Sequence, residues 1–344
     1  MKKISLQNLS ILIVGGAGFI GHNLSLHLKK LGAEVHIIDG LNVNHLGSVK
    51  KNLDSLSNPE LAKDILYERL ELLKSSDIPV YIQDARQYNE LSKYFSEINP
   101  KVVIHLAAVS HANRSNKDPH STFDHSLRTL ENALDNAKNR IEHFIFLSSS
   151  MVYGNFKSKE VDEKTICEPL GIYGALKLAA EKIIISYNQV FNLPYTIVRP
   201  SALYGERCIS RRVGQIFIEN ALQNKEIEIH GDGNEKLDFT YIKDLIDGIT
   251  KVIENPNSKN EIFNITFGQA RSINDLLDIL KESFPSTTIK KISRDKLMPK
   301  RGTLSIEKAK SIINYRPNWS IDKAYPEYIK WYLDFFEKKY NIKK

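Results

Sequence analysis

Cysteine is nearly absent from this sequence. The 344 residues include two, Cys167 and Cys208, which are too few for a disulfide framework and do not lie at the spacing of metal ligands. We therefore expect no disulfide scaffold and no metal site. Such low cysteine use is typical of proteins in a reducing compartment, which favours a cytoplasmic location.

Long hydrophobic runs are missing as well. No stretch reaches the roughly 18 uninterrupted apolar residues that indicate a membrane-spanning helix. Residues 1–10 mix lysine, glutamine and asparagine with apolar residues, and they lack the apolar segment of a signal peptide. We therefore expect no membrane partner.

The charge pattern shows no concentrated basic region. The net charge is +7 and the isoelectric point is about 9.0, values that a nucleic-acid-binding protein could share. The lysines are dispersed, however, and the densest clusters, at residues 290–291 and 343–344, are short. We expect no nucleic-acid partner, and a mild basic excess suits a substrate that carries phosphates.

Short apolar runs alternate with helical patterns along the first 200 residues. The predicted strands lie at residues 11–14, 35–38, 80–82, 102–104, 144–147 and 196–198. Buried strands separated by helices indicate a parallel sheet with helices on both faces, so we predict an α/β protein with a Rossmann-type doubly wound parallel sheet.

A helix is also predicted at residues 23–31. The long connection at residues 44–79 contains an additional predicted helix at 59–74.

After residue 201 the pattern becomes irregular, with a predicted helix at 211–224 and a strand at 227–230. This part predicts a smaller C-terminal substrate-binding lobe. The boundaries that we expect are residues 1–200 plus about 238–256 for the nucleotide-binding domain, and residues 201–237 and 257–344 for the smaller lobe.

A glycine-rich segment joins the first predicted strand to the first helix. Gly15, Gly18 and Gly21 have the spacing G-x-x-G-x-x-G, and Phe19 and Ile20 lie where the helix begins. In a dinucleotide site the first glycine permits the tight turn, the second lets the pyrophosphate approach, and the third lets helix and strand pack closely. The alternative is a glycine turn without a ligand.

Acidic and small residues follow the next strands. A carboxylate at Asp39 would accept hydrogen bonds from ribose hydroxyls and repel a 2′-phosphate, which favours NAD over NADP; the alternative is a turn aspartate. Asp84, with Ala85 beside it, is placed to contact the adenine. Ala107 and Ala108 would let the cofactor pass over the end of a strand, although either pair is also compatible with an ordinary loop.

A serine of the run at residues 148–150, Tyr173 and Lys177 form the predicted catalytic group. The serine run follows a strand, and Tyr173 and Lys177 lie four residues apart, so they share one face of a helix. An ammonium near a phenol lowers the pKa of the phenol, and the phenolate can then take a proton from a sugar hydroxyl. The alternative is a solvated lysine beside a packed tyrosine.

These motifs together resemble the extended short-chain dehydrogenase/reductase family, in particular its NAD-dependent sugar epimerase/dehydratase branch. The resemblance covers nearly the whole chain and rests on residues 15–21, 39, 105–108, 148–154, 173 with 177, 199–200, 231–233, 238–239 and 301. It implies NAD as the cofactor, oxidation at C4 of a nucleotide sugar, Tyr173 as the base, Lys177 as its partner and cofactor contact, and Ser149 at the C4 oxygen.

The residues after Ser149 narrow the reaction. Similar 4,6-dehydratases carry an acidic pair where this chain has Ser150 and Met151, and similar decarboxylases usually have glutamate at the position of Met151. The resemblance therefore favours a 4-epimerase, an isomerase. A 4-keto-sugar reductase, a hexuronate decarboxylase, a dehydratase and, more remotely, a non-catalytic dinucleotide sensor remain alternatives.

The substrate side departs from the family pattern. Residues 107–115 resemble a loop of UDP-N-acetylhexosamine and hexuronate 4-epimerases, and Arg114 of this loop would face the sugar. Ser149 and Ser150 are also predicted to contact the substrate. The usual phosphate-contacting asparagine and arginine are replaced by Ala202 and Leu237. The candidates to supply the missing phosphate contacts are Arg211, Arg212, Lys236 and Arg301. Arg211 and Arg212 are also compatible with solvent-exposed residues at the start of a helix.

These departures leave the nucleotide open: a UDP-sugar is favoured, and GDP or CDP is possible. The resemblance also implies polysaccharide biosynthesis and a homodimer formed through helices near residues 123–137 and 173–190.

Overall fold

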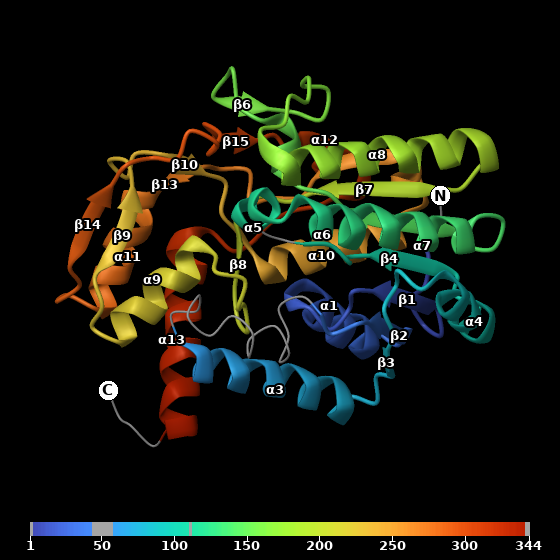
Figure 1. Ribbon diagram of the computed structural model, residues 1–344, viewed down its shortest axis with the longest axis horizontal. Helices are drawn as coiled ribbons and strands as arrows, with labels where there is room; N and C mark the ends of the chain where they lie inside the picture. The colour runs from blue at the N-terminus through green and yellow to red at the C-terminus, as the bar shows by residue number, and fades with distance from the viewer. Residues whose placement is uncertain (1–2, 43–57, 110–111, 341–344) are drawn as a thin grey trace.

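A seven-stranded parallel sheet forms the centre of the protein. The computed structural model describes residues 3–42, 58–109 and 112–340, and the sheet has the strand order β12-β7-β5-β4-β1-β2-β3 (Figure 1). Its strands are β1 (Ser10–Val14), β2 (Glu34–Asp39), β3 (Val80–Ile82), β4 (Val102–His105), β5 (His143–Leu147), β7 (Tyr195–Arg199) and β12 (Glu261–Asn264). The prediction of a doubly wound parallel sheet is confirmed.

The apolar run of β1 serves both faces of the sheet because successive side chains point in opposite directions. Ile11 and Ile13 belong to one buried cluster, and Leu12 and Val14 belong to another. In register, Ile11 lies between Val35 of β2 and Val102 of β4. A strand in this position is buried on both sides, which explains why its sequence is continuously apolar.

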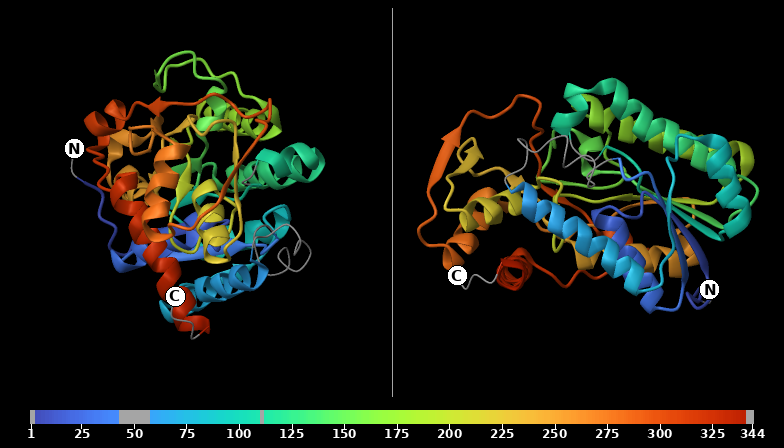
Figure 2. Two further views of the ribbon diagram at one scale, coloured as in Figure 1. Left: turned by 90° about the vertical axis from the view of Figure 1, so that its left-hand side faces the viewer. Right: turned by 60° about the horizontal axis from the view of Figure 1, so that its bottom comes forward.

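Helices cover each face. The cluster around Ile11 and Ile13 includes side chains of α1 (Phe19–Lys30), α3 (Pro59–Ser75) and α10 (Ile242–Glu254). The cluster on the other face includes side chains of α4 (Tyr88–Ile98), α7 (Thr129–Ala137) and α8 (Gly171–Phe191). The two groups of helices lie on opposite sides of the sheet in the views of Figures 1 and 2.

The later part of the chain builds a smaller region at one end of the sheet, on the left of Figure 1. It contains α9 (Val213–Leu222), β9 (Ile227–His230), α11 (Ile273–Ser283) and β14 (Ile289–Ile292), with β9 and β14 paired in parallel. Its buried residues are continuous with the cluster on the α1 face. The predicted division into two domains stays a prediction.

The remaining elements are mostly short, apart from the 20-residue helix α13. They are α5 (Ala112–Lys117), α6 (Pro119–Phe123), the π-helix η2 (Asp124–Arg128), η3 (Ser150–Tyr153), β6 (Glu160–Val161), β8 (Leu203–Tyr204), β10 (Lys236–Leu237), β11 (Thr240–Tyr241), η4 (Pro256–Ser258), β13 (Arg271–Ser272), β15 (Thr303–Leu304), α12 (Glu307–Ile313) and α13 (Ile321–Tyr340). The helices predicted to form a dimer interface correspond to α6 through α7 and to α8, and the dimer itself stays a prediction.

Two helix boundaries differ from the prediction. The first helix begins at Phe19 rather than near residue 23, so its N-terminus lies at the glycine-rich loop. The helix predicted at 211–224 begins at Val213, which leaves Arg211 and Arg212 in the preceding loop. The additional helix is confirmed as α3, whereas residues 43–57 of the same connection lie outside the described residues.

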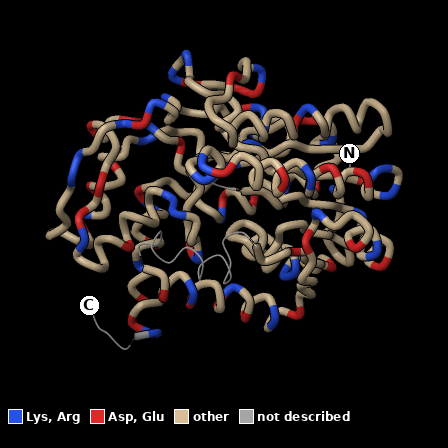
Figure 3. Tube along the Cα trace, viewed as in Figure 1, with Lys and Arg blue, Asp and Glu red and all other residues tan. Residues whose placement is uncertain are grey.

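Charged residues of both signs are interspersed along the chain (Figure 3), as the dispersed lysines of the sequence indicate. In the part of the chain that the structure describes, no helix is both long and apolar enough to span a lipid bilayer.

Candidate active site

The glycine-rich loop turns sharply between β1 and α1. Gly15 has a φ of +81°, and a Cβ there would lie 2.6 Å from the backbone nitrogen of Ala107, so only glycine fits. A Cβ on Gly18 would instead have its nearest contact at 3.5 Å, which is ordinary packing. Gly18 lines a pocket, and it caps α1 without a side-chain hydrogen bond. A glycine at this position therefore leaves room for a ligand at the helix N-terminus.

The pocket lies at the carboxyl ends of the parallel strands. It is lined by every predicted cofactor-binding residue outside α8: Gly15, Gly18, Phe19, Ile20, Gly21, Asp39, Asp84, Ala85, Ala107 and Ala108. A crevice at this edge, with a glycine cradle and exposed helix N–H groups, fits a dinucleotide such as NAD.

Asp39 is held in place by backbone groups on either side of the pocket edge. One carboxylate oxygen accepts a hydrogen bond from the Ala17 N–H at 3.0 Å, and the other accepts one from the Leu41 N–H at 2.9 Å. These contacts fix the carboxylate at the end of β2, where it lines the pocket. Its position agrees with the predicted ribose contact.

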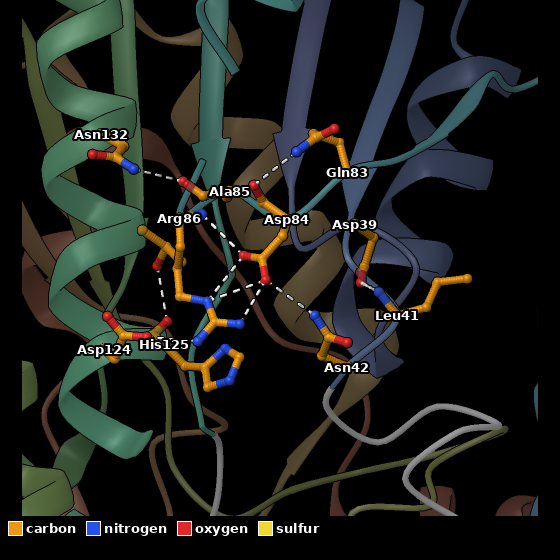
Figure 4. A network of polar contacts seen from close by, with 11 residues as sticks. Asp39, Leu41, Asn42, Gln83, Asp84, Ala85, Arg86, Asp124, His125 and Asn132 are labelled. Atoms are coloured by element: carbon orange, nitrogen blue, oxygen red, sulfur yellow. Dashed lines mark hydrogen bonds and ion pairs between the residues drawn. The ribbon is translucent and has the colours of Figure 1, made fainter. Parts of the chain in front are cut away.

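Asp84 belongs to a polar network that the sequence analysis missed (Figure 4). The guanidinium of Arg86 binds Asp84 at 2.6 Å and Asp124 of the π-helix η2 at 2.5 Å, and Asn42 donates to Asp84 at 3.2 Å. Hydrogen bonds from Arg86 hold the pKa of Asp84 below its usual range, against the effect of burial. His125, beside Asp124, lines the pocket. No sequence spacing links Arg86 to Asp124, because the two join only in the fold.

Ser149 and Tyr173 interact through their side chains. Ser149 ends the loop after β5, where its hydroxyl accepts a hydrogen bond from the Met151 N–H at 3.2 Å and caps η3. Burial raises the pKa of Tyr173, while the charge of Arg212 and a hydrogen bond with the Ser149 side chain act in the opposite direction. The structure thus brings together a phenol, a hydroxyl and a guanidinium.

Lys177 has its ammonium group at the end of β5. Its ammonium donates to the Leu147 carbonyl at 2.6 Å and lies 4.6 Å from the centre of the Phe146 ring. The charge of Arg212 opposes the effect of burial on the pKa of Tyr173, and the effect expected of Lys177 on this pKa stays a prediction. Burial lowers the pKa of Lys177 itself to about 8.

A buried ion pair anchors α8 behind these residues. Arg199 donates to both carboxylate oxygens of Glu181, at 2.9 and 2.6 Å, and Ser148 donates to the same carboxylate at 2.5 Å. Glu181 lies one helical turn beyond Lys177, so the pair ties the helix of the predicted base to β5 and β7. The sequence analysis did not assign Glu181 or Ser148 a role.

Arg212 and Arg301 converge from distant parts of the chain. The buried Nε atom of each has no hydrogen-bond partner among the described residues. Burial, together with the charges of Arg212 and Arg294, lowers the pKa of Arg301 to about 10. Two guanidinium groups that repel each other, each with an unpartnered Nε among the described residues, form an attractive site for an anion such as a diphosphate.

The other predicted substrate residues have different surroundings. Ser150 is buried, and its N–H donates to the Pro200 carbonyl at 2.8 Å. Arg114 is exposed on α5, and Lys236 is exposed on the two-residue strand β10. Neither Arg114 nor Lys236 lines the pocket that contains Arg212.

Comparisons with known proteins agree with this geometry. The family model described as "NAD dependent epimerase/dehydratase family" matches residues 11–266. The uncharacterized UDP-glucose epimerase YtcB of Bacillus subtilis strain 168 is 30% identical, with 91% of this chain and 94% of that protein covered.

Two further relatives represent two reactions. The crystal structure of UDP-glucuronic acid 4-epimerase from Bacillus cereus, in complex with UDP-glucuronic acid and NAD, has a TM-score of 0.83 and 27% identity over 96% of this chain and 99% of that one. A dTDP-D-glucose 4,6-dehydratase of Dictyostelium discoideum is 29% identical over 74% of this chain and 57% of that protein. The chain belongs to the NAD-dependent epimerase/dehydratase family.

Proposed function

We propose that this protein is an NAD-dependent nucleotide-sugar 4-epimerase. The observation that carries the proposal is the meeting of the Tyr173 phenol with the Ser149 side chain and the charge of Arg212, next to the pocket that Gly18 and Asp39 line. This arrangement suits a substrate that offers a reactive hydroxyl to the phenol and a diphosphate to the arginines.

Each residue has a distinct task in this proposal. Tyr173 takes the proton from the sugar C4 hydroxyl and later returns it, and Ser149 holds the C4 oxygen by a hydrogen bond. The charge of Arg212 stabilises the phenolate, because it offsets the effect of burial on the pKa of Tyr173. The residues of the Gly18 loop and Asp39 would hold NAD, which would supply the acceptor for the C4 hydride and the donor for its return. Lys177, fixed by the Leu147 carbonyl, adds positive charge beside the cofactor site.

The two residues after Ser149 favour the epimerase outcome. A dehydratase needs an acid–base group for C5 and C6, whereas η3 presents Ser150 and Met151 there. A thioether cannot transfer a proton, so a 4-keto sugar formed at this site would turn and be reduced from its other face. A UDP-sugar is the favoured substrate because the epimerase structure from Bacillus cereus holds UDP-glucuronic acid.

The test compares Tyr173→Phe with Tyr187→Phe, a control on the same helix. Purified proteins are incubated with UDP-glucose, UDP-glucuronic acid and UDP-N-acetylglucosamine, and C4 epimers are quantified by NMR. Loss of general acid–base catalysis should lower turnover in Tyr173→Phe by about 10²–10⁴-fold, with NAD still bound. Tyr187→Phe should retain turnover. Unchanged turnover in Tyr173→Phe contradicts the proposal.

The fate of the cofactor separates the epimerase from its alternatives. Acid denaturation of the purified protein should release NAD that was never added, because a self-recycling enzyme retains it. Net formation or loss of NADH during turnover would instead indicate a reductase, and release of CO₂ from a hexuronate would indicate a decarboxylase. A protein that turns over no nucleotide sugar would indicate a sensor.

A further inference from the structure

The loop between β7 and α9 contains an unusual concentration of left-handed backbone. Most non-glycine residues with positive φ among the described residues are asparagine, which tolerates this conformation well. Three that are neither glycine, asparagine nor aspartate lie within this one loop: Ala202, Arg207 and Arg211. Such conformations cost free energy and persist where surrounding contacts enforce them.

The contacts that enforce the conformation of Arg207 begin at its carbonyl. Arg69 of α3 donates to this oxygen from Nε at 2.9 Å and also from Nη2. Arg69 is 1% exposed, and burial lowers its pKa to about 10. A buried guanidinium is costly unless it is well bonded, so α3 strongly favours the backbone orientation that Arg207 adopts.

The side chain of Arg207 reaches the glycine-rich loop through His22. Its Nε lies 3.1 Å from Nε2 of His22, and the Nδ1 of His22 lies 2.9 Å from the carbonyl oxygen of Gly18. Burial and the charges of Arg69 and Arg207 hold the pKa of His22 well below its usual value, so the ring is neutral. The partners assign the tautomer: Nδ1–H donates to Gly18, and Nε2 accepts from Arg207.

The same loop leads directly to the proposed diphosphate site. Ser210 and Arg212 both line the pocket that contains Gly18. Cys208, between them and Arg207 in the chain, is fully buried, and its thiol is near enough to both Arg69 and Arg212 for their charges to lower its pKa against the effect of burial. One short, packed segment therefore connects the His22 contact to Arg212.

We propose that Arg207 is a positioning residue that couples the two binding sites: through His22 it links the Gly18 loop, which holds the cofactor pyrophosphate, to Arg212, which holds the substrate diphosphate. Each nucleotide then stabilises the arrangement that binds the other, as reciprocal linkage requires. This inference rests on the proposed function, since it assumes that Arg212 binds the diphosphate. The network gives the enzyme a means to retain NAD while a sugar nucleotide is bound.

The test measures how fast NAD leaves the purified holoprotein with and without saturating UDP. In the unaltered protein UDP should slow NAD release by about fivefold or more, the lower end of typical coupling. Arg207→Gly keeps the carbonyl acceptor and suits the left-handed backbone, so it should fold. Without the guanidinium, the effect of UDP should fall below about twofold, whereas a merely structural role would leave this ratio unchanged.

Two further variants isolate the His22 contact. The amide of His22→Asn can still donate to the Gly18 carbonyl but does not reach Arg207, so this variant should show the same loss. Combining it with Arg207→Gly should add little, because both changes remove one interaction. Lys243→Ala is the control. It removes an exposed cation of α10 that lies 3.4 Å from Glu206, a residue of the loop between β7 and α9, and it should keep the full effect of UDP.

Direct titration of UDP in the same samples distinguishes the possible failures. If UDP binds but does not slow NAD release in the unaltered protein, or if the full effect survives in Arg207→Gly, the coupling is overturned and the proposed function stands. Loss of the effect in Lys243→Ala as well would overturn it, because general disorder of the loop would then explain the result. Absence of UDP binding in the unaltered protein would overturn the coupling to UDP and the assignment of a UDP-sugar as the substrate.

Discussion

The proposed cofactor end and the proposed substrate end of the site are built in different ways. The cofactor end is dominated by one contiguous turn, in which Gly15 and Gly21 satisfy close backbone packing and Gly18 leaves room for a ligand. The substrate end is assembled from separate segments that bring Ser149, Tyr173, Arg212 and Arg301 together. Local backbone geometry therefore defines the cofactor end, whereas charged groups brought together by the fold define the substrate end.

The largest effect that should sharpen this comparison is at Gly18. Gly18→Ala adds a methyl group that the protein accommodates, since its nearest contact would be 3.5 Å away, but that occupies the ligand's space. NAD affinity should fall by about 10²-fold, close to the upper cost of overpacking, with little change in Tm. Gly15→Ala is the contrast: its Cβ would meet backbone at 2.6 Å, so Tm should fall too. Equal losses of Tm would show that Gly18 is structural.

The difference between the two ends explains what the sequence could predict. The parallel sheet and α3 follow from apolar runs and helical periodicity, and the spacing of Gly15, Gly18 and Gly21 has the same meaning wherever it joins a strand to a helix. All of the cofactor residues predicted outside α8 line one pocket. Their roles depend on neighbours within a few residues or on the ends of adjacent strands.

The features that the sequence did not predict depend on contacts between residues that lie far apart in the chain. Arg86 joins Asp124, and Arg207 joins His22 and Arg69, only because the fold brings them together. The hydrogen bond from the Lys177 ammonium to the Leu147 carbonyl was not predicted either, because spacing along a helix does not show which group a side chain contacts. A sequence shows that a charge is present but not which group it faces.

A smaller effect is expected at Arg301, where a substitution should weaken UDP binding but raise the stability of the fold. Arg301→Met removes a buried guanidinium whose Nε has no partner among the described residues, so Tm should rise. UDP affinity should fall by about 10-fold or more, because a charge-assisted hydrogen bond is worth about 1.5–3 kcal/mol. Lys300→Met, an exposed neighbour, should change neither quantity much. Unaltered UDP binding in Arg301→Met would remove this residue from the diphosphate site.

The smallest effect concerns the substrate end alone and depends on pH. Glu219 of α9 is 3% exposed, and burial raises its pKa to about 7, against hydrogen bonds from Gln215 and Tyr332. Because the folded-state pKa lies above the unfolded value of about 4.3, ionisation costs more in the folded state, and stability falls as pH rises from about 4.3 to about 7.

Glu219→Gln can accept both hydrogen bonds without a charge. Its free energy of unfolding at pH 8 should exceed that of the unaltered protein by about 1–2 kcal/mol, a value that allows for relaxation of the protein around the carboxylate. At pH 5 the difference should be much smaller. Urea titrations at both pH values, with the exposed Glu282→Gln on α11 as control, measure this difference. A gain in stability that is the same at both pH values would show that the benefit comes from packing and not from removing a buried charge.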